Sequence, residues 1–389
     1  MKFNNTQKAY HLKTDKQLKK AFYLFKIISN KSLVFLGSAI ARLALTLRLP
    51  VSSIFRATVF SQFCAGLDKV ESLKVVGALK SCNVQCYLHY AAEGVKTEKG
   101  MDVSKNKILE TLSFSKESNA LPFTVFKATG LGPIALFKKK SAGIPFKTLE
   151  LEEWSRVITR IDICCAEAEK IGIKMLIDAE ESWLQPAIDE IAESLMEKYN
   201  QKEPIIYTTL QMYRKDRLLY LKAIYEKATN GGFKVGIKLV RGAYIEKENL
   251  RAYRLGNPSP ICDSKKLTDK NFNNGIDFIL SKLETVSLFI GSHNEESVLK
   301  VINWMTLNKV PKDHPYIWFS QLYGMADHIS FNLASSGYHV IKYVPYGPVN
   351  DVIPYLIRRA EENTSISGQT PRELNLIKKE LKRRKTMAV

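Results

Sequence analysis

The sequence predicts a closed (β/α)₈ barrel of the TIM type, preceded by an N-terminal helical arm. Three observations predict this fold. Eight short β-rich runs recur along the chain, a longer segment of helical composition follows each, and most runs are continuously apolar or β-branched. Strands buried on both faces, as in a parallel sheet, have that composition. Eight strand–helix units over roughly 280 residues also match the usual size of such a barrel.

The elements are predicted in order along the chain. Residues 1–75 have helical composition, with polar breaks near Asn30 and Pro50, and form the arm. The eight predicted strands are Gln85–Tyr90, Leu121–Lys127, Ile173–Asp178, Ile205–Gln211, Phe233–Val240, Val286–Gly291, Tyr316–Gln321 and Tyr338–Val344. Segments with helical spacing lie between them, for example Trp154–Ile171 and Asp216–Thr229.

An open doubly wound sheet is the structural alternative to the barrel. Such a sheet usually carries a G-x-G-x-x-G turn after its first strand, where the glycines allow close approach of a pyrophosphate. The nearest match, Gly130-Leu131-Gly132-Pro133, lacks the third glycine and contains a proline in the turn. The pattern therefore favours the barrel.

The net charge of +19 is concentrated at the two ends of the 389-residue chain. Residues 1–50 contain ten Lys or Arg against one acid, and residues 370–389 contain seven against two, so these ends carry +14. We assign residues 76–376 to the barrel and residues 377–389 to a basic C-terminal tail. Basic ends suit an anionic membrane surface or nucleic acid, and solubilising tails are the plain alternative.

The six cysteines show neither zinc-site spacing nor a disulfide framework, and free thiols indicate a reducing compartment. The most apolar early stretch, Leu33–Leu47, contains Arg42 and is about 15 residues long, whereas a bilayer span needs roughly 20. We expect a helix there that packs on the domain or lies on a membrane.

Polar residues close nearly every predicted strand. In a barrel the carboxyl ends of the strands meet at one face, where active sites form. The residues in question are Lys127, Asp178, Glu180, Gln211, Lys238, Arg241, Ser292, His293, Gln321 and Tyr343, with Arg358 and Arg359 in the helix that follows. Each has a structural explanation alone, such as helix capping by Asp178. Together they indicate a site.

This set of residues excludes some chemistries. No H-E-x-x-H pattern or paired histidine ligands occur, so no metal site is expected, and no G-x-S-x-G nucleophile turn is present. Arginines, lysines, a glutamine and a histidine with few carboxylates suit an anionic substrate and a cofactor that carries phosphates.

Several motifs resemble the proline dehydrogenase family, in order between about Phe60 and Leu376. They are Asp178-Ala179-Glu180 with Gln185-Pro186-Ala187, Lys238-Leu239-Val240-Arg241-Gly242-Ala243-Tyr244 with Glu246-Lys247-Glu248, Gln321-Leu322-Tyr323-Gly324-Met325, Tyr343-Val344-Pro345-Tyr346-Gly347, and Tyr355-Leu356-Ile357-Arg358-Arg359 with Glu362-Asn363. The family's fold is a distorted (β/α)₈ barrel that binds FAD. Without an attached aldehyde dehydrogenase domain, the chain resembles the monofunctional type.

The resemblance implies roles for individual residues. It implies that FAD contacts Ala179, Gln211, Lys238, Arg241, Gly242, Ala243, Ser292, His293 and Glu362. It implies that Lys127, Arg358 and Arg359 bind the substrate carboxylate, that Tyr343 packs on the proline ring, and that Glu93 pairs with Arg358 over the bound substrate. Asp178 and Lys238 would be the catalytic residues, with Asp178 orienting Lys127. Hydride transfer from L-proline would give 1-pyrroline-5-carboxylate, with a membrane quinone as electron acceptor.

One position departs from the family pattern. The family usually has an Asp four residues before Glu93, and this sequence has His89 there. A histidine would leave the site more positive, so we expect an altered affinity for proline that depends on pH near neutrality.

Other functions remain open. The substrate could be a related cyclic imino acid such as hydroxyproline, or the barrel could have lost catalysis and serve as a binding protein. Nucleic-acid binding is not expected, because no basic and aromatic motif of a known module appears. We expect a cytoplasmic protein, with peripheral contact to the inner face of the membrane through the basic ends.

Overall fold

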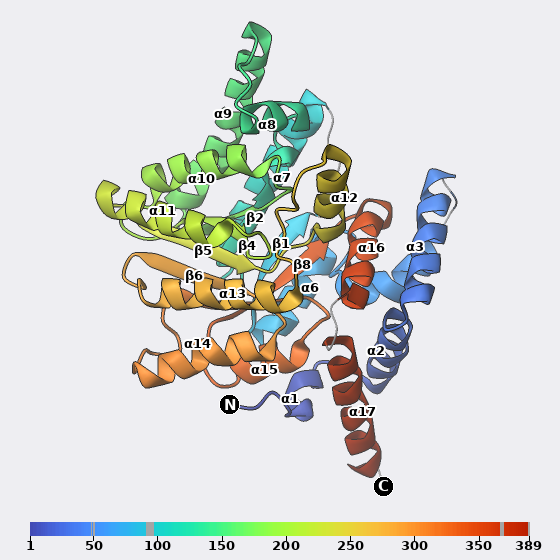
Figure 1. Cartoon of the computed structure of the whole chain (residues 1–389). Coiled ribbons are helices and arrows are strands. Elements are labelled where there is room, and N and C mark those ends of the chain that lie inside the picture. The colour runs from blue at the N-terminus through green and yellow to red at the C-terminus, as the bar shows by residue number, and fades with distance from the viewer. Residues whose placement is uncertain (48, 50, 91–96, 366–368, 388–389) are drawn as a thin grey trace. The chain divides into compact units, whose positions relative to one another are not determined.

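The computed structural model describes the chain apart from residues 48, 50, 91–96, 366–368 and 388–389. Its eight strands form one sheet in the order β1-β8-β7-β6-β5-β4-β3-β2, and parallel pairing curls the sheet into a nearly closed barrel with helices between the strands (Figure 1). The fold class predicted from the sequence is therefore confirmed.

Each predicted run overlaps one observed strand. The strands are β1 (Gln85–Tyr90), β2 (Phe123–Lys127), β3 (Lys174–Asp178), β4 (Ile206–Gln211), β5 (Val235–Val240), β6 (Val286–Gly291), β7 (Ile317–Leu322) and β8 (Val340–Tyr346). The largest shift is at β8, where Tyr338 precedes the first strand residue. Its ring is buried against Phe319, with centroids 5.7 Å apart, so it contributes an apolar signal without joining the strand.

Helices occupy most of the remaining chain. Those before the first strand are α1 (Thr6–Tyr10), α2 (Asp15–Ile28), α3 (Lys31–Thr46), α4 (Ser52–Phe55), the π-helical turn η1 (Arg56–Phe60), α5 (Ser61–Phe63) and α6 (Lys69–Lys80). Those between strands are α7 (Glu98–Glu117), the 3₁₀ turn η2 (Ala128–Gly130), α8 (Ile134–Ser141), α9 (Thr148–Lys170), α10 (Gln185–Tyr199), α11 (Arg217–Gly231), α12 (Ile245–Leu255), α13 (Lys265–Leu280), α14 (Glu295–Leu307) and α15 (Asp327–Ala334). Helices α16 (Val349–Ser365) and α17 (Gln369–Met387) follow β8.

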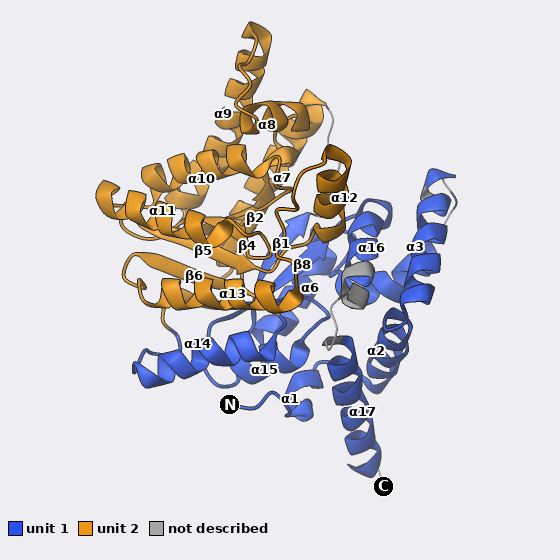
Figure 2. Cartoon of the chain, in the orientation of Figure 1, with its two compact units in different colours: residues 1–93, 293–313, 319–389 blue, residues 94–292, 314–318 orange. Residues whose placement is uncertain are grey.

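The chain divides into two compact units (Figure 2). Residues 94–292 and 314–318 form one, called here the β2–β6 unit, and residues 1–93, 293–313 and 319–389 form the other, called the β1–β8 unit. In the β2–β6 unit, helices α10, α11 and α13 lie on the outer side of strands β4 to β6 (Figure 1).

Aromatic side chains define the inward face of the strands in the β2–β6 unit. Phe123 of β2 packs edge-on against Tyr207 of β4 and Phe289 of β6, with ring centroids 5.5 and 5.1 Å apart. Side chains alternate between the two faces of a strand. Three polar side chains lie four residues after an inward-facing one on the same strand: Lys127 after Phe123, Gln211 after Tyr207, and Asp178 after Lys174, whose ammonium lies over the Phe123 ring. The Lys238 ammonium itself lies over the Phe289 ring. All four side chains therefore project to this inward face.

In the β1–β8 unit, the C-terminal segment that was expected to be a tail is part of a helix. Helix α17 continues to Met387, so the boundary placed between residues 376 and 377 falls within it, just as the boundary at 75 and 76 falls within α6. Arg384 donates hydrogen bonds to the carbonyl oxygens of Tyr10 and Lys13 and to the carboxylate of Asp15, each 2.8 Å long. These contacts with the N-terminal helices hold the basic end in an ordered position.

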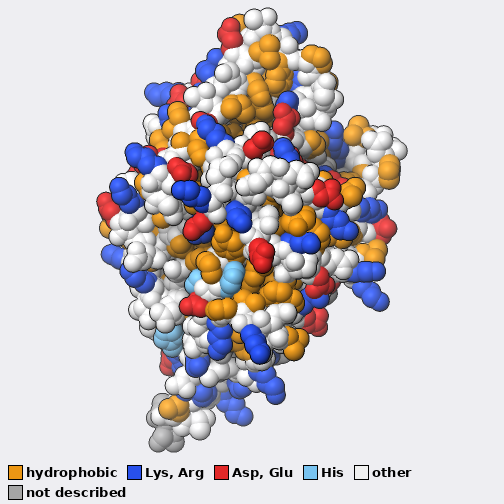
Figure 3. Space-filling model, turned by 90° about the vertical axis from the view of Figure 1, so that its left-hand side faces the viewer, with side chains coloured by type: hydrophobic (Ala, Val, Ile, Leu, Met, Phe, Trp, Pro, Cys, Tyr) orange, Lys and Arg blue, Asp and Glu red, His pale blue; other side chains and the backbone are white. Residues whose placement is uncertain are grey.

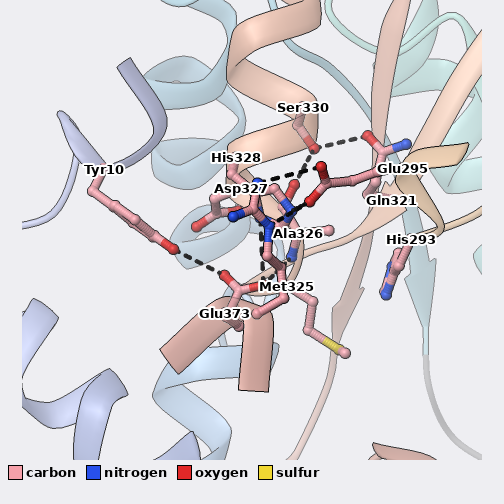
Figure 4. A network of polar contacts seen from close by, with 12 residues as sticks. Tyr10, His293, Glu295, Gln321, Met325, Ala326, Asp327, His328, Ser330 and Glu373 are labelled. Atoms are coloured by element: carbon pink, nitrogen blue, oxygen red, sulfur yellow. Dashed lines mark hydrogen bonds and ion pairs between the residues drawn. The ribbon is translucent and has the colours of Figure 1, made fainter. Parts of the chain in front are cut away.

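A buried polar network joins the start of α15 to neighbouring elements of the same unit (Figure 4). The ammonium of Lys342 on β8 is fully buried and donates to Asp327 at 2.9 Å. Glu373 of α17 accepts hydrogen bonds from the Tyr10 hydroxyl at 3.3 Å and the Ala326 backbone at 3.1 Å. The network therefore links the first and last helices to the loop after β7.

Helix α3 exposes its larger apolar side chains and buries smaller ones. The buried positions are Val34, Ser38, Ala41 and Ala44, and the exposed ones are Leu33, Phe35, Leu36, Ile40 and Leu43, which are 49–77% exposed.

Within the described residues, no single helix has the length and hydropathy of a membrane span. Helix α2 and residues Lys31–Ala44 together have that length and hydropathy, but the chain bends by 96° at the break between them.

Side chains of both charges share one face of the molecule. Figure 3 presents one face of the molecule, on which Lys and Arg side chains are interspersed with Asp and Glu side chains.

Candidate active site at the strand ends

Lys127, Asp178 and Lys238 gather at the carboxyl ends of neighbouring strands in the β2–β6 unit. The Lys238 ammonium donates to the Asp178 carboxylate at 2.6 Å, and this pair is largely buried, with side chains 8% and 17% exposed. Lys127 and Asp178 are opposite residues in the β2–β3 register. The site therefore holds two cations beside one carboxylate, an arrangement that can bind an anion while Asp178 fixes the position of Lys238.

Gln211 connects the loops that follow β3 and β5. Its side-chain amide donates to the carbonyl oxygen of Glu180 at 2.7 Å, and its side-chain oxygen accepts from the backbone N–H of Ala243 at 3.2 Å. Burial raises the pKa of Glu180, although the charge of Lys127 and hydrogen bonds from Thr129 oppose that rise. The sequence placed Gln211 and Ala243 in the site but assigned no role to Glu180.

Arg241 is held at the end of β5 by partners that are distant in sequence. Its guanidinium donates to Asp269 at 2.6 Å and to the Ser292 hydroxyl at 2.9 Å, and it lies over the Phe272 ring, 4.3 Å from the centroid. Partial burial opposes ionisation of Asp269, but hydrogen bonds from Lys265 and Arg241 outweigh it and hold its pKa below the usual value. No sequence pattern links Asp269 to Arg241, so sequence reasoning missed this carboxylate.

Gly242 is required where it stands. Its φ of 128° lies in a region that residues with a side chain rarely adopt, and an added Cβ would lie 2.3 Å from the Tyr213 ring. Any other residue here would displace the loop that carries Arg241 and Ala243.

The residues of the β2–β6 unit fit a flavin nucleotide by their chemistry. Arg241 and Ser292 offer donors of the kind that bind phosphate oxygens, while Lys238 and Gln211 offer a charge and an amide for a polar ring. Ala179 is partly exposed directly after Asp178, so a flat ring could approach its small side chain. These residues would hold FAD, which when bound supplies a two-electron acceptor.

In the β1–β8 unit, Tyr343 of β8 lies within a row of aromatic side chains. Its hydroxyl and His89 Nδ1 are 2.6 Å apart, and its ring lies 6.1 Å from that of Tyr355 on α16. Arg359, one helical turn after Tyr355, places its guanidinium over the Tyr355 ring at 5.4 Å. Arg358 and Arg359 are both partly exposed, as groups that bind a soluble anion must be.

His293 is half-buried directly after β6, and its neutral form is favoured. Burial, followed by the charges of Lys342 and Arg359, lowers its pKa to about 3. Its Nε2 accepts a hydrogen bond from the Leu322 backbone N–H at 3.0 Å, so in the neutral ring the proton is on Nδ1. His293 can therefore donate one hydrogen bond without carrying a charge.

Three remaining sequence assignments have different outcomes. Gln321, one of the polar residues at the strand ends, accepts a hydrogen bond from Ser330 of α15 at 2.8 Å, so its side chain faces that helix rather than the barrel interior. Glu93 lies outside the described residues. Glu362 falls in α16, but its side chain is not among those described.

Comparisons with known proteins identify the family of the chain. Residues 72–372 match the family described as proline dehydrogenase. A carbapenem antibiotics biosynthesis protein, CarD, from Pectobacterium carotovorum subsp. carotovorum is 34% identical over 318 residues, covering 82% of each chain. Mitochondrial proline dehydrogenase 1 of Dictyostelium discoideum is 31% identical, covering 98% of this chain and 74% of its own. A hydroxyproline dehydrogenase of Xenopus laevis is 28% identical, covering 96% of this chain and 88% of its own.

A similar fold occurs in a solved structure. Proline utilization A from Bdellovibrio bacteriovorus, inactivated by N-propargylglycine, superposes with a TM-score of 0.71 at 19% identity, over 93% of this chain. This chain spans only 38% of that protein's length. Because the family match covers most of the sequence, the chain belongs to the proline dehydrogenase family, a family of oxidoreductases.

Proposed function

We propose that this protein is an FAD-dependent L-proline dehydrogenase that forms 1-pyrroline-5-carboxylate and passes the electrons to a membrane quinone. The observation that carries the proposal is the buried Lys238–Asp178 pair with Lys127 beside it, at the strand ends of a barrel of this family. A cationic site with a buried carboxylate suits an amino-acid carboxylate better than a neutral substrate.

The residues divide the work between substrate and cofactor. From the family's motifs, we assign the binding of the proline carboxylate to Lys127, Arg358 and Arg359, and the pairing with Arg358 to Glu93. Tyr343 packs on the ring of the substrate. Asp178 and Lys238 are assigned as the catalytic residues, because Asp178 fixes the Lys238 ammonium, which would supply positive charge to a bound flavin. The residues assigned from the family's motifs to hold the cofactor, when it is bound, are Ala179, Gln211, Arg241, Gly242, Ala243, Ser292, His293 and Glu362.

A related cyclic imino acid is the second candidate substrate. The Xenopus relative named hydroxyproline dehydrogenase supports it. Tyr343 supports proline instead, because its buried ring leaves little space for an added hydroxyl group. A barrel that has lost catalysis and only binds a ligand is the third candidate, and the departure at His89 is what favours it.

The test is to follow the flavin spectrum while substrate is added without oxygen. The purified protein should be yellow, and L-proline should bleach the absorbance of the oxidised flavin faster and at lower concentration than trans-4-hydroxy-L-proline does. The Asp178→Asn variant should keep its flavin but bleach more slowly, because the amide no longer compensates the charge of Lys238. A colourless protein would favour the binding-protein candidate, and faster bleaching by hydroxyproline would reverse the choice of substrate.

The proposed electron acceptor requires a surface that meets a lipid bilayer, and α2 with α3 supplies suitable chemistry. Tyr23 and Ile27 of α2 are 63% and 52% exposed, next to the exposed apolar row of α3. Between Asp15 and Asp68 the sequence contains eight Lys or Arg residues and no acid. Apolar side chains flanked by basic ones favour an anionic membrane surface.

The sequence predicts membrane contact through both basic ends, and we now assign that contact to one of them. The basic residues of α17 are partly engaged within the molecule, since Glu380 accepts hydrogen bonds from both Arg383 and Arg384. We therefore assign the membrane contact to the N-terminal helices, with a peripheral position on the inner face of a cytoplasmic membrane.

A further inference from the structure

A row of four rings in the β1–β8 unit connects strand β1 to helix α16. Tyr87 packs edge-on against Tyr343 with centroids 5.2 Å apart, and the His89 ring lies 5.4 Å from Tyr343 at an interplanar angle of 33°. On its other side Tyr343 lies 6.1 Å from Tyr355, tilted by 34°. Tyr343 is thus enclosed by aromatic neighbours from two different elements.

The strand register explains why these side chains meet. In the parallel β1–β8 pair, Tyr87 is opposite Tyr343 and His89 is opposite Pro345. Residues two apart on a strand project to the same face, so Tyr87 and His89 both project toward Tyr343. The preceding residue, Lys342, projects to the other face and pairs with Asp327 of α15. A shift of β8 by one residue would turn Tyr343 to the face of Lys342, so the strand register fixes the face on which the Tyr343 ring lies.

The contact between His89 and Tyr343 restrains the tyrosine in two ways. The 2.6 Å separation of His89 Nδ1 and the Tyr343 hydroxyl is that of a short hydrogen bond, with the donor set by the imidazole tautomer. The imidazole and phenol rings also lie near one another, with centroids 5.4 Å apart and planes tilted by 33°. The aspartate that the family usually has at this position could accept the hydrogen bond but would offer no flat ring to pack against.

The same row leads to an arginine. Tyr355 and Arg359 are four residues apart on α16, so they share one face of that helix. The Arg359 guanidinium lies 5.4 Å from the centroid of the Tyr355 ring, within the range of a cation–π interaction. A shift of the Tyr343 ring would therefore change the packing of Tyr355, and a shift of Tyr355 would change its contact with the Arg359 guanidinium.

We propose that His89 is a positioning residue for substrate binding, which acts by holding the Tyr343 hydroxyl and, through Tyr343 and Tyr355, the guanidinium of Arg359. The inference rests on the proposed function, in which Tyr343 and Arg359 bind the ring and the carboxylate of L-proline. His89 itself touches no reacting atom in this proposal. It sets the affinity for substrate, and the rate of the chemical step depends on other residues.

A double-mutant cycle tests whether His89 acts through the Tyr343 hydroxyl. His89→Phe keeps a flat ring without the hydrogen bond, and Tyr343→Phe removes only the hydroxyl. Each single variant should raise KM for L-proline about tenfold, the effect of losing one buried hydrogen bond, while kcat changes less than about twofold. The double variant should be no worse than the single variants, because both remove the same interaction.

Two further variants separate positioning from general damage. His89→Asn places a hydrogen-bonding atom where Nδ1 stands, so it should recover most of the lost affinity. Tyr225→Phe, on α11, removes a tyrosine hydroxyl from a ring that packs on Phe278 instead, and KM should stay at the wild-type value. The dissociation constant of tetrahydrofuran-2-carboxylate, a proline analogue with oxygen in place of the ring nitrogen, should change in parallel with KM.

The outcomes distinguish this inference from the proposed function. Additive effects in the double variant, or a fall in kcat at unchanged KM, would overturn the role of His89 while wild-type activity on proline stands. A wild-type protein whose flavin is not reduced by L-proline would overturn the proposed function and this inference with it. Unaltered binding of the analogue in His89→Phe would contradict the inference directly.

Discussion

The residues of the candidate site are fixed by partners that remove their freedom to move. Asp178 holds Lys238, Asp269 holds Arg241, and the Leu322 backbone N–H holds His293. A side chain that already has its bound orientation loses less entropy when a ligand arrives. Preorganisation of this kind is what a site that binds and orients a small anion requires.

His293 makes the stability of the protein depend on pH. Its pKa of about 3 in the folded state lies below the ordinary value of 6.5, so between these values unfolding takes up a proton. The free energy of unfolding should therefore fall as the pH drops from 6.5 toward 3. At pH 5 the cost is about 2 kcal/mol, from 1.5 pH units at about 1.4 kcal/mol each.

Chemical denaturation at pH 7 and pH 5 measures this effect in the wild type and in His293→Asn. The variant cannot take up the proton, so its loss of stability between the two pH values should be about 2 kcal/mol smaller than that of the wild type. An equal loss in both proteins would mean that His293 does not bind the extra proton on unfolding.

At the scale of elements, the junction between β7 and α15 is a tightly constrained turn in the β1–β8 unit. Gly324 has a φ of 76°, and an added Cβ would lie 1.8 Å from the Gln62 carbonyl oxygen. Ala326 also has a positive φ, of 49°, although it is not glycine. The buried Lys342–Asp327 pair and Glu373 stabilise this backbone, because all three bond to the turn or to the start of α15.

Removal of the carboxylate at Asp327 should destabilise the protein strongly. Asp327→Ala leaves the fully buried Lys342 ammonium without its counter-charge, which costs about 3–5 kcal/mol. The matched control is Asp263→Ala, because Asp263 also pairs with a lysine at 2.8 Å but both side chains, at 75% and 48%, are exposed. That control should cost less than about 1 kcal/mol.

Denaturation by urea, with activity measured in parallel, compares the two variants. Adding Lys342→Met to Asp327→Ala should recover part of the stability, because the unpaired charge is removed. Equal losses in Asp327→Ala and Asp263→Ala would show that the burial of this pair contributes nothing.

At the scale of the whole molecule, the distribution of charge and apolar surface supports the proposed membrane contact. Large exposed apolar side chains of α2 and α3 coincide with the stretch that has eight basic residues and no acid. An exposed apolar patch of this kind indicates an interaction site.

Two variants with the same change of charge test the membrane contact. Phe35→Glu/Ile40→Glu should weaken co-sedimentation with anionic vesicles by roughly tenfold or more, because two large side chains no longer enter the lipid. Leu219→Glu/Leu307→Glu, at positions 74% and 82% exposed on α11 and α14, should bind like the wild type. Both variants should oxidise proline normally with a water-soluble acceptor.

Equal binding by both variants would place the contact elsewhere on the molecule. Undiminished binding to neutral vesicles would remove the role assigned to the basic residues.

The sequence by itself determined the strands and the residues at their ends. Local composition marks a strand that is buried on both faces, and the alternation of side chains decides which residues share a face. Asp178, Gln211 and Lys238 could therefore be assigned to one end of the barrel before any contact was known. The family's motifs add residue roles that no local pattern contains.

The tertiary structure decided which residues became partners. Asp178 meets Lys238 across 60 positions, and His89 meets Tyr343 across 254. The basic end expected to be a tail is a helix because Arg384 bonds to carbonyl oxygens of the N-terminal segment. Composition cannot show such contacts, because their energy depends on which distant segments the closed sheet brings together.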